Sequence, residues 1–252
     1  MPKFAANLNF LFKEWPFLDR FDAAAAAGFT AVEVLFPYDH AAKEITRRLT
    51  RNGLRMVLIN TPPPNWAGGD RGFAAIPGGE ARFRHDFTRA LRFAKALGAV
   101  HLHVMAGRAR GLVAKQTFIR NLQWAAAQAP RQSLTIEPIN PVDMPGYFLD
   151  DFDLAAEVIE AVGAPNLGLQ FDAYHAQMIT GDAARVWAEH GHRTHHIQVA
   201  GCPGRHEPGA CDVDYPAFFR GLDEIGYKGW VSGEYHPRED TLRGLDWIRG
   251  DG

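Results

Sequence analysis

Eight short stretches rich in apolar and β-branched residues recur along the chain, and a segment with helical periodicity follows each one. The stretches cover residues 3–9, 31–36, 54–60, 99–105, 133–137, 167–172, 194–200 and 229–234. An unbroken alternation of strand and helix requires parallel strands joined by right-handed crossovers. The 252 residues allow about 31 residues for each strand–helix unit, which is the size expected of a closed (β/α)8 TIM barrel.

Glycines and aspartates stand where the predicted helices should end and begin. Gly53, Gly98 and Gly163 each follow a helical segment and precede a strand, where a left-handed backbone suits glycine. Asp150 or Asp151, and later Asp214, stand where helix N-caps would fall. A doubly wound open sheet is the competing fold, but no glycine-rich phosphate loop follows the first strand. We therefore predict an α/β fold, a (β/α)8 TIM barrel that forms a single domain over residues 1–252.

A long segment rich in proline and glycine, residues 60–80, interrupts this alternation after the third strand. Its composition rules out a regular element. Loops of this length are usually functional, so we expect a lid over the carboxyl end of the third strand. Trp66 on this loop is a candidate substrate contact, and a contact between subunits of a homo-oligomer is its alternative role.

The overall charge and the apolar content limit the possible partners. Lys and Arg total 27 against 29 Asp and Glu, and this balance argues against nucleic-acid binding, which needs a basic surplus. No apolar run reaches the ~18 residues of a membrane-spanning helix, and the first residues lack the features of a secretory signal. Two cysteines cannot build a disulfide framework. These features predict a cytoplasmic protein that acts on a small molecule.

Oxygen-bearing side chains stand at or near the ends of four consecutive predicted strands, namely Glu137, Asp172, Gln198 and Glu234. In a barrel these ends surround the active site. Two unit charges ~5 Å apart repel by about 3 kcal/mol at an effective dielectric constant of ~20, so three converging carboxylates need protons or a cation. Carboxylate and amide oxygens suit Mg²⁺ or Mn²⁺. Any one of them alone would more simply be a salt-bridge partner or a helix cap, but the set predicts a metal site.

Further candidates lie beside these strand ends. His175 would lie one helical turn beyond Asp172 and on the same side, where it could bond a substrate oxygen, orient a ligand, or simply pack. Arg205 lies in a tight loop rich in glycine and proline after the seventh strand and could hold a substrate carboxylate, with a surface charge as the alternative. His206 in the same loop and His103 near the end of the fourth strand are additional candidates for substrate binding.

A zinc cluster of His192, His195 and His196 is disfavoured. His195 and His196 are neighbours, so on a strand they would point to opposite faces. No thiol completes a zinc-binding pattern with them.

Several segments are similar to the hydroxypyruvate isomerase family, which belongs to a superfamily of xylose isomerase-like barrels that also holds ketose 3-epimerases and endonuclease IV. The similarity extends over nearly the whole chain. Its most specific part is the loop Pro-Gly-Arg-His-Glu-Pro-Gly, and it also includes the segments Phe-Thr-Ala-Val-Glu-Val-Leu-Phe-Pro-Tyr from residue 29, Leu-Gln-Phe-Asp-Ala-Tyr-His from residue 169 and Gly-Trp-Val-Ser-Gly-Glu-Tyr from residue 229.

The resemblance implies a metal-dependent aldose–ketose isomerase of small hydroxy-oxo acids that converts hydroxypyruvate to tartronate semialdehyde, or acts on a 2-oxo-tetronate. Glu137 and Glu234 match the family's two metal-bound acid/base glutamates, and Asp172 and Gln198 match its other metal ligands. In this mechanism the cation stabilises a cis-enediolate, one glutamate removes a carbon-bound proton, and a glutamate returns one at the neighbouring carbon.

Three departures from the family pattern, at residues 211–215, at His236 and in the proline-rich loop 60–66, concern the rim of the pocket and therefore the identity of the substrate more than the type of reaction. A ketose 3-epimerase of neutral sugars is the main alternative, because the same chemistry serves both. A phosphodiesterase similar to endonuclease IV is disfavoured by the charge balance and the scarcity of histidine at strand ends. A non-catalytic barrel is disfavoured because both Glu137 and Glu234 are present.

Overall fold

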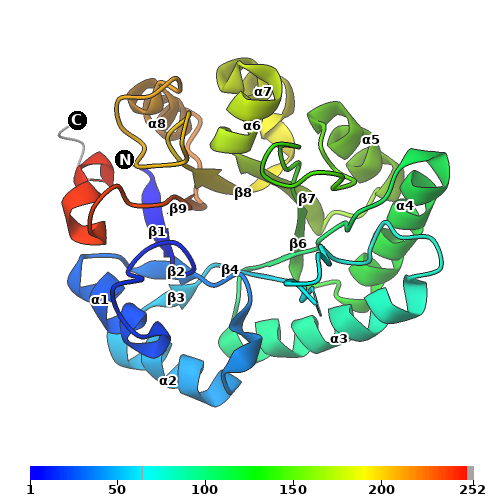
Figure 1. Ribbon diagram of the computed structural model, residues 1–252, viewed down its shortest axis with the longest axis horizontal. Coiled ribbons are helices and arrows are strands. Elements are labelled where there is room, and N and C mark those ends of the chain that lie inside the picture. The colour runs from blue at the N-terminus through cyan, green and yellow to red at the C-terminus, as the bar shows by residue number, and fades with distance from the viewer. Residues whose placement is uncertain (64, 249–252) are drawn as a thin grey trace.

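Nine parallel strands form the centre of the molecule in the computed structural model, which describes residues 1–63 and 65–248 (Figure 1). Their order around the sheet is β3-β2-β1-β9-β8-β7-β6-β5-β4. The strands are β1 Lys3–Asn7, β2 Ala31–Glu33, β3 Arg55–Met56, β4 Leu58–Asn60, β5 His101–His103, β6 Ser133–Ile136, β7 Leu167–Asp172, β8 Thr194–Val199 and β9 Trp230–Gly233. All eight predicted stretches contain strand, and the third contains two.

The segment that holds β3 and β4 nearly closes the barrel. Its first part pairs with β2 and its second part pairs with β5. At the junction, the backbone N–H of Val57 donates to Val32 O at 2.8 Å, and the N–H of His101 donates to Val57 O at 2.8 Å. One extended segment therefore joins both edges of the sheet, and the predicted TIM barrel is confirmed.

Helices surround the strands on the outside (Figure 1). They are α1 Arg20–Ala26, α2 Ala42–Asn52, α3 Glu80–Leu97, α4 Gly111–Gln128, α5 Phe152–Val162, α6 Ala173–Thr180, α7 Ala183–His190 and α8 Tyr215–Glu224. Gly53, Gly98 and Gly163 adopt the left-handed conformation at the ends of α2, α3 and α5, as predicted. Asp151 and Asp214 accept hydrogen bonds from backbone N–H groups in the first turns of α5 and α8.

The expectation of a helix after every strand is wrong at the end of the chain. In the described residues, β9 is followed only by the short 3₁₀ turns Thr241–Gly244 and Asp246–Ile248. Trp247 in the second turn is buried and lies against Phe4, with ring centroids 5.0 Å apart. One aromatic side chain thus covers the outside of β1 where a full helix would otherwise pack.

The residues between β4 and α3 form an irregular segment, as its composition predicts. Gly72 pairs with Ala106 in an isolated β-bridge, and Ala75 N–H donates to Ala106 O at 2.7 Å, so the segment packs on the chain that follows β5. Trp66 is 43% exposed and lies against Phe36, with ring centroids 5.3 Å apart. The segment therefore lies at the carboxyl end of the barrel strands.

Alternation along β7 sends polar side chains into the barrel and an apolar one outward. On β7, Gln170 and Asp172 join the buried polar network inside, whereas Phe171 packs outward on Trp187 and Phe218. None of the helices in the described part of the chain has the length and apolar character needed to cross a membrane.

Candidate active site

The four side chains predicted from the strand ends meet at the mouth of the barrel. Glu137 follows β6, Asp172 ends β7, Gln198 lies on β8 and Glu234 follows β9, and all four are buried. Gln170 links them, because its amide nitrogen donates to Glu137 Oε2 at 3.1 Å and to Gln198 Oε1 at 2.7 Å. The amide nitrogen of Gln198 donates in turn to Glu234. Glu137, Gln198 and Glu234 therefore belong to one hydrogen-bonded network. Asp172 lies beside it.

Arg205 lies against this network. Its Nη2 is 2.7 Å from Glu234 Oε1 and 3.5 Å from Asp172 Oδ2, and its Nη1 is 3.5 Å from Asp143 Oδ2. The guanidinium also lies 5.0 Å from the ring centroids of Phe10 and Tyr174. Its backbone has a φ of 54°, in the left-handed region. The alternative of a solvated surface charge is therefore wrong, because the side chain contacts the carboxylates of two strands.

Two histidines lie beside Glu137. His175 is buried, and its Nε2 is 3.7 Å from Asp172 Oδ2 and 3.9 Å from Glu137 Oε1. His103 is also buried, with Nδ1 3.7 Å from Glu137 Oε2 and, among the described residues, no hydrogen-bond partner for either ring nitrogen. Burial lowers the pKa of His103 to about 3, so this ring is neutral at physiological pH.

Besides Gln170, Glu33 and Asn7 also belong to the network and were not predicted from the sequence. Glu33 at the end of β2 is fully buried and accepts hydrogen bonds from Asn7 at 2.9 Å, from Gln198 at 2.7 Å and from His196 at 2.8 Å. Asn7 on β1 also donates to Glu234 Oε2 at 2.9 Å. Asn7 ends β1 and Glu33 ends β2, and both are polar residues in otherwise apolar strands. A search for polar residues at the ends of the first two strands would have found them.

Burial, together with crowding, raises the pKa values of three carboxylates in the site. Burial, followed by repulsion from Glu234 and Asp172, raises the pKa of Glu137 well above its usual value. Burial raises the pKa of Glu234 to about 8 and that of Asp172 to about 6, although Arg205 lowers both. Without a cation, therefore, protons remain on part of this cluster at neutral pH.

Three of the buried side chains are placed compatibly with a divalent metal ion. Asp172 Oδ2 is buried and has no hydrogen-bond partner in the described structure. One ligand atom from each of Glu137, Asp172 and His175 lies within 4.8 Å of the others, and this is the one such group of three among the described residues. The zinc cluster of His192, His195 and His196, which the sequence disfavours, is not formed among the described residues, since His196 points inward to Glu33 whereas His195 contacts Ser133.

Two predicted substrate contacts lie farther out, at the rim. His206 Nδ1 is 2.8 Å from His236 O, and Trp66 lies on the segment between β4 and α3. Within the described part of the chain, neither side chain has a hydrogen bond or ion pair with the four strand-end residues. The structure thus brings His103, His175 and Arg205 to the centre of the site and leaves His206 and Trp66 around it.

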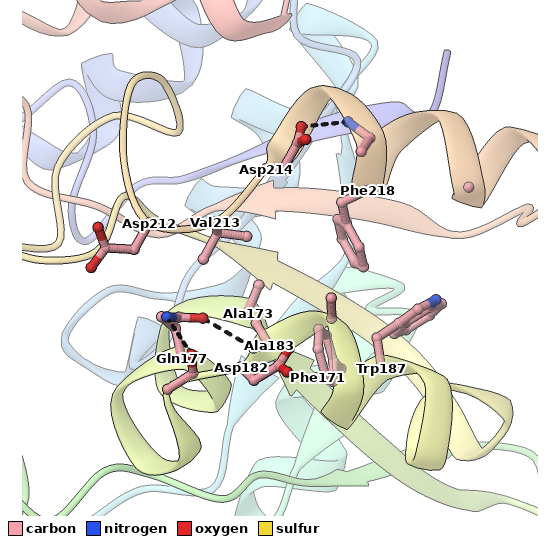
Figure 2. A pocket seen from close by; sticks show the side chains of 14 residues that line it. Phe171, Ala173, Gln177, Asp182, Ala183, Trp187, Asp212, Val213, Asp214 and Phe218 are labelled. Atoms are coloured by element: carbon pink, nitrogen blue, oxygen red, sulfur yellow. Dashed lines mark hydrogen bonds between the residues drawn. The ribbon is translucent and has the colours of Figure 1, made fainter.

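A separate apolar pocket of about 400 Å³ lies outside the barrel, between α6–α7 and α8 (Figure 2). Phe171, Trp187 and Phe218 line it. Two of the aspartates at its edge, Asp182 and Asp214, cap the helices α7 and α8 through backbone N–H groups. The pocket faces the outer side of β7, whereas Asp172 points inward, so it is not the candidate active site.

The xylose isomerase-like TIM barrel family profile matches residues 21–250. The chain belongs to this family. Among its relatives, the 2-oxo-tetronate isomerase of Cupriavidus necator is 48% identical over 99% of this chain and 98% of its own length. The hydroxypyruvate isomerase of Escherichia coli is 39% identical over 98% of both chains. The family assignment and the prediction of an isomerase are thereby confirmed.

A crystal structure of a protein from Brucella melitensis, described as an AP endonuclease of family 2, superimposes on this chain with a TM-score of 0.96. It is 44% identical and covers 100% of this chain and 99% of its own. The two chains therefore share the barrel over nearly their whole lengths.

Proposed function

We propose that the protein is a divalent-metal-dependent aldose–ketose isomerase of a small hydroxy-oxo acid, with 2-oxo-tetronate or hydroxypyruvate as substrate. The names of the relatives at 48% and 39% identity support these substrates. The observation that carries the proposal is the pair Glu137 and Glu234, which lie buried in one network with Arg205 bonded to Glu234. The two glutamates are proton-transfer groups, and the positively charged guanidinium of Arg205 suits an acidic substrate.

The two glutamates transfer the proton. Their raised pKa values suit groups that must take up and release a proton near neutral pH. One glutamate removes a proton from the carbon that bears the hydroxyl group, and a glutamate delivers a proton to the former carbonyl carbon. The hydroxyl proton moves to the other oxygen, so hydroxypyruvate and tartronate semialdehyde contain the same atoms and no external oxidant or reductant is needed.

Arg205 binds the substrate carboxylate. Its Nη2 is occupied by Glu234, so Nη1, at 3.5 Å from the exposed Asp143, faces the rim from which the substrate enters. A guanidinium binds a carboxylate through charge-assisted hydrogen bonds. His103 and His175 bind substrate oxygens from the other side of the site, and His206 and Trp66 bind the substrate at the rim.

Glu137, Asp172, Gln198 and Glu234 would hold the cation, with Mg²⁺ or Mn²⁺ as the expected ion because the donors are oxygens. When bound, the ion supplies positive charge that stabilises negative charge developing on the substrate oxygens. Asp172 Oδ2, which has no hydrogen-bond partner among the described residues, and the crowding of buried carboxylates that raises their pKa values support this site.

Solvent exchange provides the test. The protein is incubated in D₂O with Mg²⁺ and either hydroxypyruvate or 2-oxo-tetronate, and proton NMR follows exchange of the carbon-bound hydrogen and formation of product. We expect both for at least one acid, and a Glu137→Gln variant should lose at least about 100-fold in rate, as expected of general acid–base catalysis. The matched control is Glu157→Gln, because Glu157 lies on the outside of the barrel. No exchange and no product with either acid would argue against the proposal.

The same measurement separates the alternatives. A ketose 3-epimerase would turn over a neutral ketohexose in preference to either acid. Because the Brucella protein is described as an AP endonuclease, a second control incubates the protein with DNA that contains an abasic site. The formal net charge of −2 predicts no cleavage.

A further inference from the structure

Asn140, in the segment between β6 and α5, is fully buried and forms hydrogen bonds in two directions. Its Oδ1 accepts from the backbone N–H groups of Val142 at 3.1 Å and of Asp143 at 2.9 Å. Backbone N–H groups can only donate, so they fix which end of the amide is the oxygen. The amide nitrogen of Asn140 must therefore be the atom that lies 2.8 Å from His175 Nδ1.

This contact determines where His175 carries its proton. The amide nitrogen of Asn140 can only donate, and its backbone N–H also points to His175 Nδ1 at 3.4 Å. His175 Nδ1 must therefore accept, which requires a bare nitrogen. An imidazole with a bare Nδ1 is neutral and holds its proton on Nε2. That proton lies on the side of Asp172 Oδ2, at 3.7 Å, and of Glu137 Oε1, at 3.9 Å.

We propose that Asn140 is a positioning residue that holds His175 as the Nε2–H tautomer and makes it a hydrogen-bond donor in the site. A protonated nitrogen has no lone pair to bind a cation, so His175 is not a metal ligand. Its distances to Glu137 and Asp172 alone would be compatible with a shared metal ion. Its Nε2–H instead faces Asp172 Oδ2, which lies 3.7 Å away and has no hydrogen-bond partner among the described residues, and it donates to a substrate oxygen when substrate is bound. The second role rests on the proposed isomerase function.

The same side chain connects the site to its rim. Through Oδ1, Asn140 holds the turn that carries Asp143, and Asp143 faces Arg205 Nη1. Through Nδ2 it holds His175, whose other nitrogen faces the carboxylates. One buried amide thus contacts both His175 and the turn that carries Asp143.

The tautomer can be read directly by NMR on the metal-free protein labelled with ¹⁵N in histidine. A protonated ring nitrogen and a bare one differ widely in ¹⁵N chemical shift, and a His175→Gln variant identifies the signals of His175 among the 11 histidines. We expect a bare Nδ1 and a protonated Nε2. A protonated Nδ1, alone or together with Nε2, would overturn the proposal. This measurement needs no substrate, so its outcome is independent of the proposed function.

Asn140→Asp separates the two roles of the amide. Aspartate keeps an acceptor for the N–H groups of Val142 and Asp143, but it presents an oxygen to His175 Nδ1. That oxygen requires a donor, so the proton should move to Nδ1, and turnover should fall roughly 10- to 100-fold with the rim turn intact. In the matched variant Asn140→Ala the turn should loosen as well, and the KM should rise in addition. An unchanged tautomer in Asn140→Asp would show that Asn140 does not position His175.

Calorimetric titration with Mn²⁺ tests the exclusion of His175 from the ligand set. His175→Gln should bind Mn²⁺ within about twofold of the unmodified protein, because the ligands are the oxygen donors. A loss of tenfold or more would overturn the exclusion, since a direct imidazole ligand would then be missing. If neither protein binds Mn²⁺, the proposed metal site is wrong, and the NMR result alone decides the role of Asn140.

Discussion

At the scale of single residues, the mouth of the barrel is an arrangement of carboxylates that are too crowded to be charged together. Asp172 uses one oxygen to cap α6 through Tyr174 N–H at 2.8 Å and leaves the other without a hydrogen-bond partner in the described part of the chain. Glu234 is held by Arg205 and Asn7 and still has a pKa raised to about 8. Burial thus outweighs the neighbouring positive charge, and a cation that binds here must displace the proton.

The raised pKa of Glu234 predicts a pH dependence of stability. The native state binds a proton on Glu234 up to about pH 8, whereas the unfolded state has lost it above about pH 4.5. The free energy of unfolding should therefore fall as the pH rises through 8, by about 1 kcal/mol between pH 7 and 8.5. Urea unfolding in the presence of EDTA measures this change. Glu234→Gln should make it shallower, with Glu137 contributing the remainder, and an equally steep change in that variant would assign the effect to another group.

At the scale of the elements, short polar caps and glycine turns set the helix boundaries. Asp151 Oδ1 accepts from Leu154 N–H at 2.7 Å and starts α5. Asp151→Ala should lower the free energy of unfolding by about 1 kcal/mol, because the first turn of α5 loses its side-chain acceptor. Urea unfolding measures the loss. Asp150→Ala is the matched control, since Asp150 is the neighbouring exposed aspartate, and it should change stability by less than about 0.5 kcal/mol.

Gly72 lets the segment between β4 and α3 pack closely on the backbone that follows β5. Gly72 has a φ of 100°, and a Cβ atom there would lie 2.3 Å from the backbone oxygen of Met105. Gly78 also has a positive φ, of 80°, but no described atom lies within 4 Å of the corresponding position.

Both Gly72→Ala and Gly78→Ala should therefore incur the backbone cost of about 1–2 kcal/mol, and only Gly72→Ala should incur the steric cost of about 1–3 kcal/mol in addition. Thermal unfolding of the two variants measures the difference. Equal losses would mean that the segment can move away from Met105 without cost.

At the scale of the whole molecule, the site joins four neighbouring strands, β6 to β9, with the first two strands through Asn7 and Glu33. A cation that binds only the folded barrel stabilises it by about 2.7 kcal/mol at 100 times its dissociation constant. Mg²⁺ at that concentration should therefore raise Tm by roughly 5–10 °C relative to EDTA at matched ionic strength. Calorimetry measures the shift. The shift should shrink in Glu137→Gln, and an identical shift in that variant would place the stabilising ion elsewhere.

The sequence by itself determined the barrel and the positions of its strand ends. Both depend on local patterns: the alternation of strand and helix, the glycines and aspartates at helix ends, and one oxygen-bearing residue at the end of each of four strands. The same local patterns failed after the last strand, where Trp247 packs on Phe4 at the other end of the chain and replaces a helix. A contact across that sequence separation has no local signature.

Only the tertiary structure decided how the side chains in the mouth share their protons and hydrogen bonds. Asn7 and Glu234 are 227 positions apart, and Gln198 and Glu33 are 165 apart, yet each pair is hydrogen-bonded in the buried network. From the sequence alone, Arg205 could be a charge on the surface. Only its position beside Glu234 in the folded chain shows that it is not. The state of a buried polar group depends on which donors and acceptors surround it in space, and closure of the barrel brings these groups together.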